Sequence, residues 1–547
     1  MTSPKPKSST SESQLVKEGL KEVGLTQREL NAVLVAVISG MFLATLDTSI
    51  LNVAIPAIVG DLGGVDQVTW IVASYLVTLT VVTPIYGKLS DIYGRKLTYQ
   101  VAATIFIVFS GLAGSVTEMW QLVVSRAFQG VGAGGLIALP MVIMGDLIPP
   151  RVRGRYMGYL SMSVVLSSVA GPLLGGVLTD QVSWRLIFFI NVPFGVASMI
   201  MVHRKFNITM PKMARSIDGI GVFLLTAALG PGLVALVVGG EEYGWTDWRF
   251  LGMLAISVVL LVAFVLWERR PAEPLLPLHL FGNSVVSVSL ANMFVLGLAL
   301  FASGLFVPIF LQIVKGASAT VSGFLTITMS IGMSFAAFTS GRLITRWQKY
   351  KGFVVIGMVL IVLGLFLLGT LTRNSPELLV TAYLTVLGFG VGATMPTYSL
   401  VIQNAVAYKD LGIASTTMNF VRSVGSAVGA AVFGALFASR IASGLEENIP
   451  AGSGMSTEQV RRLIGRPDQM RERIQNPEVL DGIIETVTDS VKVIFWTGMI
   501  VAVLGFLVSW LLKEIPLRAS LRDEEDNESK DNESKDPVKT SEAAPPV

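Results

Sequence analysis

The stretch Gly87–Lys96, which reads GKLSDIYGRK, is short, charged and bounded by glycine. It separates two long apolar runs, residues 70–86 and 97–116. Each run is close to the length that crosses the ~30 Å hydrocarbon core of a bilayer as a helix. Ten residues leave no room for a soluble domain between the runs. The stretch therefore predicts a tight connection between two membrane-spanning helices on one face of the bilayer.

The composition extends this prediction to the whole chain. Its 547 residues are 52% hydrophobic and 14% charged, and apolar runs long enough to span a bilayer recur to the end of the sequence. The first 29 residues are polar and lack the apolar segment of a cleavable signal peptide. A net charge of +3 does not favour a nucleic acid as partner. Because there is no cysteine and both histidines fall in predicted loops, we expect no metal site and no other cofactor.

Fourteen segments are predicted to cross the bilayer as helices, because the bilayer core offers the backbone no outside hydrogen-bond partner. This predicts an all-α integral membrane protein whose spans are grouped as six, two and six. The spans are 31–56, 68–87, 97–116, 120–145, 156–179 and 184–203, then 217–239 and 249–267, then 284–313, 320–341, 353–371, 377–404, 411–439 and 490–512.

The short loops predict the orientation of the chain. Alternate short loops carry seventeen Lys and Arg, whereas the remaining short loops carry four. The first set is therefore predicted to be cytoplasmic. An even number of spans then places both termini in the cytoplasm of a multi-pass protein of the plasma or inner membrane.

These spans divide the chain into predicted regions. Residues 1–29 form a cytoplasmic tail, in which Leu15–Leu30 fits either an amphipathic helix on the inner surface or a partly ordered segment. A first six-helix bundle covers 30–203, two extra helices with their linkers cover 204–283, and a second bundle covers 284–515. The second bundle includes a long outer loop, 440–489, and residues 516–547 form a disordered acidic tail.

An internal repeat supports two related bundles. Gly341-Arg342-Leu343 stands between the tenth and eleventh spans, where Gly87-Lys88-Leu89 stands between the second and third. Position 345 is Thr where the first copy has Asp91, so the second copy is degenerate. Duplicated halves around a central site are typical of secondary transporters.

Charged residues inside the spans are the main candidates for function. Asp47 lies deep in the first span and Arg126 in the fourth. A charge at the bilayer centre costs roughly 2.5–3.5 kcal/mol on insertion scales, so such residues tend to be paired or functional. We predict that Asp47 takes up and releases a proton and that Arg126 is its partner. A purely structural ion pair is the alternative.

The first connection holds the candidates for gating. Asp91 is predicted to meet Arg95 or a helix end and, together with Gly87, to latch the cytoplasmic side. Asp146 ends the fourth span just before a basic loop. It fits a proton carrier at the inner mouth, although a surface ion pair is the favoured interpretation.

Two further groups of residues are singled out. Gly171, Gly175 and Gly176 in the fifth span permit close helix approach, and Pro172 bends that span, so they are hinge candidates. Polar residues in the second half either line a substrate cavity or hold helices together; they are Asn292, Gln312, Gln403, Asn419 and Arg422.

Two absences narrow the function. Between residues 283 and 440 the only acids are Glu377 and Asp410, both in predicted loops, so the second half holds no carboxylate trap for cations. No P-loop lysine follows the glycine-rich segment Gly130–Gly135, so ATP-driven export by this chain alone is not supported. We expect a transporter and not an enzyme.

Over about residues 30–515 the chain resembles the major facilitator superfamily and, within it, the fourteen-span drug/proton antiporters. The similarity rests on five motifs, which are Gly87–Lys96, Arg126 with Gly130, Gly132 and Gly134, Gly171-Pro172 with Gly175-Gly176, Leu46–Pro56, and Trp184–Gly195. The resemblance implies proton-driven export of hydrophobic compounds. It makes Asp47 and Arg126 candidates for proton coupling, Asp91 and Arg95 for gating, and Gly171 and Pro172 for a hinge.

The expected function is a monomeric, proton-coupled antiporter that exports hydrophobic drugs or lipid-like compounds by alternating access. The acid-poor second half disfavours polycationic drugs and leaves neutral, anionic or lipid-like cargo. One alternative is a symporter or uniporter of a small metabolite. Another is a lipid-handling membrane protein without proton coupling, which the arginine-bearing loop 440–489 would suit.

Overall fold

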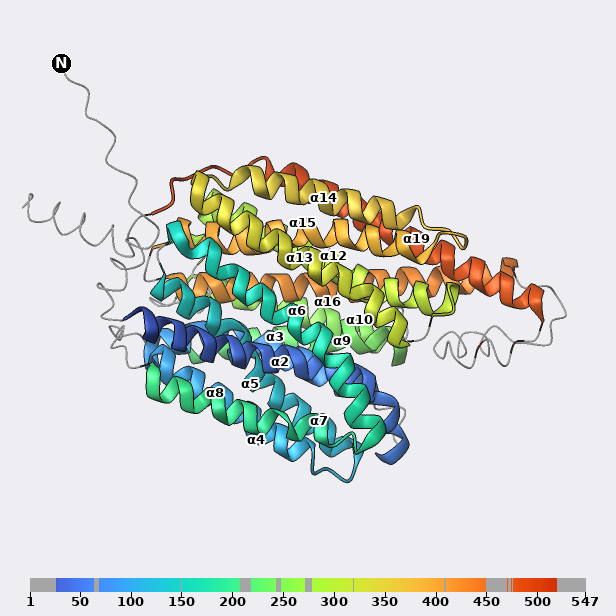
Figure 1. The fold of residues 1–547 in the computed structure, drawn as a ribbon, viewed down its shortest axis with the longest axis horizontal. Helices are drawn as coiled ribbons and strands as arrows, with labels where there is room; N and C mark the ends of the chain where they lie inside the picture. Colours follow the sequence, from blue (N-terminus) through green and yellow to red (C-terminus); the bar gives the residue numbers. More distant parts are fainter. Residues whose placement is uncertain are drawn as a thin grey trace, which may run out of the picture.

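The structure is a computed structural model that describes residues 26–518, except 63–67, 149, 207–217, 243–246, 271–277, 318, 408–409, 449–469, 471–473 and 475. Throughout these residues the regular elements are helices, and most run side by side along the long axis of the molecule (Figure 1). The first group comprises α2 (Gln27–Leu62), α3 (Val68–Tyr93), α4 (Arg95–Ala113), α5 (Met119–Leu147), α6 (Pro150–Gln181), α7 (Leu186–Phe189) and α8 (Asn191–Lys205).

A second group follows two central helices. The central pair is α9 (Gly219–Glu242) and α10 (Trp248–Trp267). The second group comprises α11 (His279–Gly282), α12 (Ser284–Ile309), the π-helix η2 (Phe310–Val314), α13 (Ala319–Trp347), α14 (Lys351–Gly369), α15 (Glu377–Ala405), α16 (Leu411–Asn448) and α19 (Pro477–Ser509). We call the end of the molecule that holds residues 87–96 the inner end, following the predicted orientation, and the opposite end the outer end.

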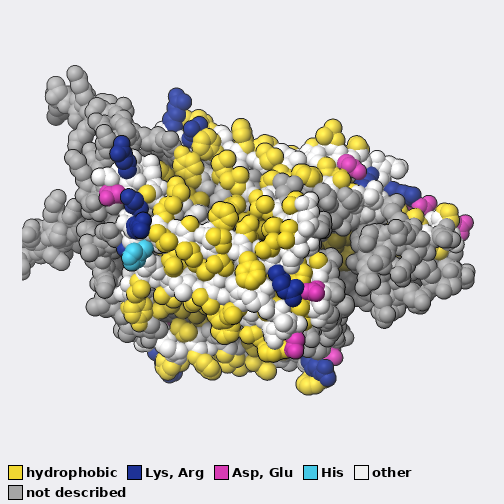
Figure 2. All heavy atoms as spheres, turned by 60° about the horizontal axis from the view of Figure 1, so that its bottom comes forward, with side chains coloured by type: hydrophobic (Ala, Val, Ile, Leu, Met, Phe, Trp, Pro, Cys, Tyr) yellow, Lys and Arg dark blue, Asp and Glu magenta, His cyan; other side chains and the backbone are white. Residues whose placement is uncertain are grey.

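The surface of the molecule is that of a membrane protein. Hydrophobic side chains cover the middle of the face in Figure 2, and most charged side chains lie toward its two ends. Twelve described helices are long and apolar enough to cross a bilayer. Shorter apolar stretches occur in α6, at Tyr156–Gly171, and in α9, at Gly219–Ala235. The membrane location is confirmed, while the count of fourteen spans stays a prediction.

The connection at residues 87–96 is tighter than predicted. Instead of a ten-residue loop, α3 continues to Tyr93 and α4 begins at Arg95. Gly94 alone turns the chain, with a φ of 91° that side chains other than glycine rarely adopt. The charged residues of this stretch therefore lie on helices, which fixes their positions.

Glycines in α5 hold the first group of helices close together. A methyl group added at Gly132 would lie 2.5 Å from the backbone nitrogen of Phe106 on α4. One added at Gly130 would lie 2.5 Å from the carbonyl oxygen of Tyr75 on α3. Only glycine allows backbones to approach this closely. The glycine-rich segment of the fourth span is thus a packing surface.

The two groups of helices meet along two seams. On one side α6 packs against α13, where the Ser168 hydroxyl donates to the Ser330 hydroxyl at 3.2 Å. On the other side α3 and α5 pack against α16. Helix α9 lies across this second seam, with Leu225 packed in a cluster that also contains Val81 of α3 and Phe420 of α16. Helix α10 packs on α9.

Both ends of the long outer loop are helical. Helix α16 continues to Asn448 and α19 starts at Pro477, and the two project beyond the other helices at the outer end (Figure 1). At the inner end, residues 516–518, predicted as part of the disordered tail, are bound to α15. The Asn404 side-chain amide donates to the Pro516 carbonyl at 3.2 Å and accepts from the Arg518 backbone at 3.0 Å. The rest of that tail and almost all of 1–29 lie outside the described residues.

Candidate functional site

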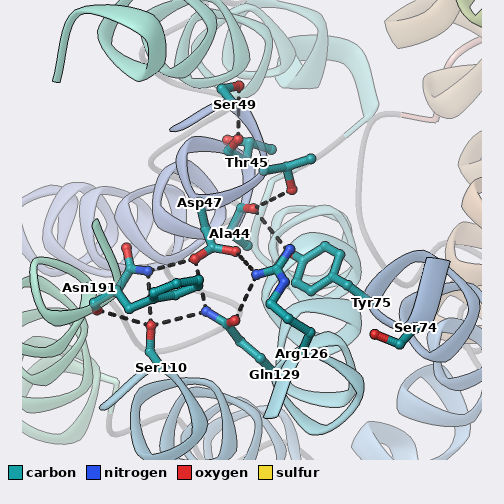
Figure 3. Close-up of polar contacts among 12 residues, drawn as sticks. Ala44, Thr45, Asp47, Ser49, Ser74, Tyr75, Ser110, Arg126, Gln129 and Asn191 are labelled. Atoms are coloured by element: carbon teal, nitrogen blue, oxygen red, sulfur yellow. Dashed lines mark hydrogen bonds and ion pairs between the residues drawn. The ribbon is translucent and has the colours of Figure 1, made fainter. Parts of the chain in front are cut away.

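A polar cluster lies in the apolar interior of the first group of helices (Figure 3). It contains Asp47 of α2, Arg126 and Gln129 of α5, and Asn191 of α8, and we call it the Asp47 cluster. All four side chains are buried, with at most 3% of any residue exposed. The predicted pairing of Asp47 with Arg126 is confirmed by a direct ion pair.

The carboxylate of Asp47 is surrounded by hydrogen-bond donors. Its Oδ2 accepts from Nη1 of Arg126, and its Oδ1 accepts from Nε2 of Gln129 at 2.9 Å and from Nδ2 of Asn191 at 2.8 Å. Nη1 of Arg126 also donates to Oε1 of Gln129 at 2.7 Å. Every partner donates to the carboxylate, which is the arrangement that suits its ionised form.

Two further residues hold the donors in place. The Ser110 hydroxyl oxygen on α4 accepts from Gln129 at 3.0 Å and from Asn191 at 2.9 Å. The guanidinium carbon of Arg126 stands 4.1 Å from the centre of the Tyr75 ring on α3, a cation–π contact. The cluster therefore ties together helices from across the first group.

The arrangement sets a condition on any proton transfer. In this conformation Asp47 has essentially no contact with solvent. Because the carboxylate is enclosed, a proton can reach it only after some of the surrounding groups move and admit water. Protonation would remove the negative charge that pairs with Arg126, so a proton transfer at Asp47 would have to be accompanied by a rearrangement of this ion pair.

Sequence reasoning identified the two charged members of the cluster but assigned no role to Gln129, Asn191, Ser110 or Tyr75. A neutral amide costs less free energy to bury in a membrane span than a charge does, so its presence in the sequence is a weaker indication of function. One signal was available, because Gln129 follows Arg126 by three residues and thus lies on the same face of its helix.

A second cluster lies at the inner end. Arg95 at the start of α4 pairs with Asp91 on α3 and with Asp146 near the end of α5, where its Nε is 2.6 Å from Oδ2 of Asp146. All three residues are buried. The favoured interpretation of Asp146 as part of a surface ion pair was right about the pairing and wrong about the exposure, because the close packing of α4 on α5 encloses the ion pair.

This inner cluster faces the second group of helices. A methyl group added at Gly412 of α16 would lie 3.0 Å from Nη1 of Arg95. One added at Gly87 would lie 3.0 Å from the Thr416 methyl group, also on α16. The predicted gating residues Gly87, Asp91 and Arg95 therefore lie where the two groups of helices meet.

A bridge between the groups lies beside this cluster. Nη1 of Arg153 on α6 donates to Oε1 of Gln403 on α15 at 2.7 Å. The other guanidinium nitrogens donate to the carbonyls of Ile148 and Gly145, at 2.9 and 2.6 Å. From the sequence, Arg153 was predicted only as one of the basic residues of a cytoplasmic loop. The bridge and the α16 contacts close the molecule at its inner end.

The hinge candidates in α6 pack directly on α2. A methyl group at Gly171 would collide with Ser49, and one at Gly175 would lie 3.1 Å from the Ile50 carbonyl oxygen. Pro172 and Gly176 belong to the same helix, but their side chains are outside the described part of the structure. Their role as a hinge stays a prediction.

The polar residues of the second half do not all come together, although two of them meet at Met141 of α5. Gln403, which is also bound by Arg153, donates to the Met141 carbonyl at 3.4 Å, and Asn419 contacts the Met141 sulfur at 3.3 Å. Asn292 on α12 is bound to the Val288 carbonyl of its own helix and lies close to α19. Gln312 lies on η2, which directly follows α12. Arg422 on α16 is half-buried.

The Trp184–Gly195 motif forms an outer clamp as well as contributing Asn191. Nη1 of Arg185 is 2.5 Å from Oδ2 of Asp61 at the end of α2, and the Trp184 indole donates to the same oxygen at 3.1 Å. These partners hold the pKa of the exposed Asp61 carboxyl below its usual range. The clamp joins the outer ends of α2 and α7.

The comparisons with known proteins agree with this fold. Residues 37–430 match the Major Facilitator Superfamily. The multidrug transporter protein MdtP of Bacillus subtilis is 30% identical over 525 residues, covering 92% of this chain and 96% of that protein. An uncharacterised MFS-type transporter of Mycobacterium tuberculosis is 35% identical, covering 91% and 71%. The solved structure of the proton:xylose symporter XylE superposes with a TM-score of 0.60 at 13% identity, covering 91% and 99%.

Proposed function

The chain belongs to the major facilitator superfamily, and on that premise we propose that it is a proton-coupled antiporter that exports hydrophobic small molecules. Members of this family are membrane transporters and not enzymes, so the Asp47 cluster has to be understood as part of a transport cycle. The relatives named for multidrug transport, which match nearly the whole chain, support export of drug-like or lipid-like compounds.

The single observation that carries the proposal is the buried Asp47–Arg126 ion pair with its amide donors. It joins helices of one bundle through a group that changes charge when a proton binds. In the proposed cycle, the inner end is closed as in this structure, water reaches Asp47 from the outer side, and protonation releases Arg126. Cargo then leaves. Return to the inward state restores the ion pair and expels the proton to the cytoplasm.

The proposed architecture follows the sequence-based division. Two six-helix bundles, 30–203 and 284–515, would rock about a midplane site, with α9 and α10 as the two extra spans and both termini in the cytoplasm. One proton moving through ~100 mV supplies roughly 2.3 kcal/mol, enough for more than a tenfold gradient of neutral cargo. We expect the monomer to be the working unit.

The complete donor shell of Asp47 favours one competing function. If the ion pair is only a structural clamp, the protein would move cargo or lipid without proton coupling. Reversing the imposed pH gradient distinguishes the antiporter from a symporter or uniporter, because an antiporter expels cargo as protons enter.

The test uses the purified protein in sealed vesicles. We expect Asp47→Asn to abolish proton-driven movement of a neutral dye such as Nile red. Because this change leaves Arg126 buried without its anionic partner, the double variant Asp47→Asn with Arg126→Gln is measured beside it. Asp61→Asn, which removes the carboxylate of the outer clamp, is the matched control and should retain coupling. Normal proton exchange in the folded double variant would contradict the proposal.

A further inference from the structure

Arg422 lies in the first third of α16 (Leu411–Asn448), on the helix face that also carries Ser415 and Asn419. It lies eleven residues from Leu411, which at 1.5 Å per residue is about 16 Å along the helix from the inner end. It follows Asn419 by three residues and Ser415 by seven, so all three share a helix face. Asn419 touches Met141 of α5 in the first bundle, and Ser415 accepts from Gln403 of α15, which is itself bound by Arg153 of α6. This face of α16 therefore begins at the junction of the two bundles.

Arg422 has no partner in the part of the chain that the structure describes. Its Nε is buried without a hydrogen bond. No ion pair or side-chain hydrogen bond joins it to a described residue, in contrast to Arg95, Arg126 and Arg153, which each have two or more partners. Its backbone, in contrast, is tightly packed, since a methyl group at Gly297 of α12 would collide with the Arg422 carbonyl. The backbone at Arg422 is therefore held in place, while its guanidinium has no counter-ion among the described residues.

Among the described side chains of the helices that pack on α16, the acids are paired or lie near helix ends. Helix α12 has no acid. Asp91 of α3 and Asp146 of α5 are both held by Arg95 at the inner end. The acids of α19 fall between Glu478 and Asp489, outward of Trp496, which binds the Gly369 carbonyl at the outer end of α14. Asp47, deep in α2, is paired with Arg126.

We propose that Arg422 binds the anionic group of an amphipathic organic anion, which is the cargo class that this transporter prefers. This rests on the proposed export function and names the substrate that it serves. The guanidinium presents a planar set of donors that matches a carboxylate or a phosphate in two parallel hydrogen bonds. In a region of low dielectric, a fixed positive charge without a counter-ion attracts anions and repels cations.

Binding is measured first, independently of transport. The full chain in lipid nanodiscs is titrated with fluorescein, an anion, and with rhodamine 6G, a cation built on the same xanthene ring, by fluorescence anisotropy. We expect Arg422→Gln to weaken fluorescein binding about tenfold or more, the usual effect of removing one charge-assisted hydrogen-bonding partner, and to leave or improve rhodamine 6G binding. Arg422→Lys should restore most of the fluorescein affinity.

Arg440→Gln is the matched control, because Arg440 is exposed further along the same helix. Thermal unfolding of each variant reports whether Arg422 only supports packing. Equal effects of Arg422→Gln on both dyes, or no effect on either, would overturn the inference.

Transport then separates this inference from the function on which it rests. Vesicles with an imposed pH gradient are loaded with fluorescein, or carry a fluorescent phosphatidic acid, to distinguish free anions from lipid headgroups. If Asp47→Asn loses proton coupling but binds fluorescein normally, the antiporter proposal and the anion site are both supported. Proton-independent movement in the wild type contradicts the antiporter proposal alone, and dye selectivity that ignores Arg422 contradicts the anion site alone.

Discussion

Buried polar side chains in this protein receive hydrogen bonds from more than one helix. The Asp47 cluster is the clearest case, since one carboxylate receives hydrogen bonds from α5 and α8 while it belongs to α2. Charged residues in apolar spans could be predicted as important from their cost alone. Their neutral partners could not, because Asn191 lies 144 residues from Asp47 and no local pattern reports that distance in space.

The contribution of Asn191 is open to a direct test. Asn191→Leu removes a donor from Asp47 and one from Ser110 and leaves a buried charge less well satisfied. We expect the free energy of unfolding to fall by about 1–3 kcal/mol. The measurement is thermal unfolding in detergent, with Asn31→Leu as control, because Asn31 is exposed at the start of α2. An equal loss in both variants would contradict this assignment.

At the scale of the helix, glycine sets how closely elements pack. The crossing of α6 on α2 at Gly171 and Gly175 follows from a spacing of four residues, and close approach there was predictable from the sequence. The exact ends of helices were not. Residues 87–93 were expected in a loop because they are charged, whereas packing against α16 favours continuing the helix to Tyr93.

Gly171→Ala tests this crossing. The added methyl group meets Ser49, so α6 must shift away from α2, and we expect a loss of about 1–3 kcal/mol in unfolding free energy together with slower transport. Gly304→Ala on α12 is the control, since no atom lies within 4 Å of the added carbon. That change should be neutral or stabilise by up to about 1 kcal/mol. Matching losses in the two variants would show that packing at Gly171 is not the cause.

At the scale of the molecule, the two bundles are joined at the inner end by the bridge from Arg153 to Gln403 and by the contacts of α16. The family and the membrane class could be predicted from motifs such as GKLSDIYGRK, because tight turns and buried charges have narrow sequence requirements. The conformation could not be predicted in this way. The bridge joins Arg153 to Gln403, which are 250 residues apart in the sequence, and it depends on how the two bundles meet.

Breaking that bridge should open the inner end. In Arg153→Gln the charge-assisted hydrogen bonds to Gln403, Gly145 and Ile148 are lost, and we expect the open-to-closed ratio to rise about tenfold or more. The chain has no cysteine, so Leu97→Cys and Lys349→Cys provide unique sites for a pair of spin labels, one on each bundle. Double electron–electron resonance reports their separation.

Arg346→Gln serves as control for that experiment, because Arg346 is an exposed arginine in the last turn of α13. A longer label separation should appear in Arg153→Gln and not in Arg346→Gln. An unchanged distance distribution in both would mean that the bridge does not hold the inner end closed.

Helix α9 covers one of the two seams between the bundles, so the two sides of the molecule differ. Leu225 and its neighbours screen the junction of α3 and α16 from the fatty acyl chains, whereas no described helix covers the junction of α6 and α13. A hydrophobic compound dissolved in the bilayer therefore meets α9 on one flank and the contact line between α6 and α13 on the other. We expect a compound that enters sideways from the lipid, and not from water, to do so between α6 and α13.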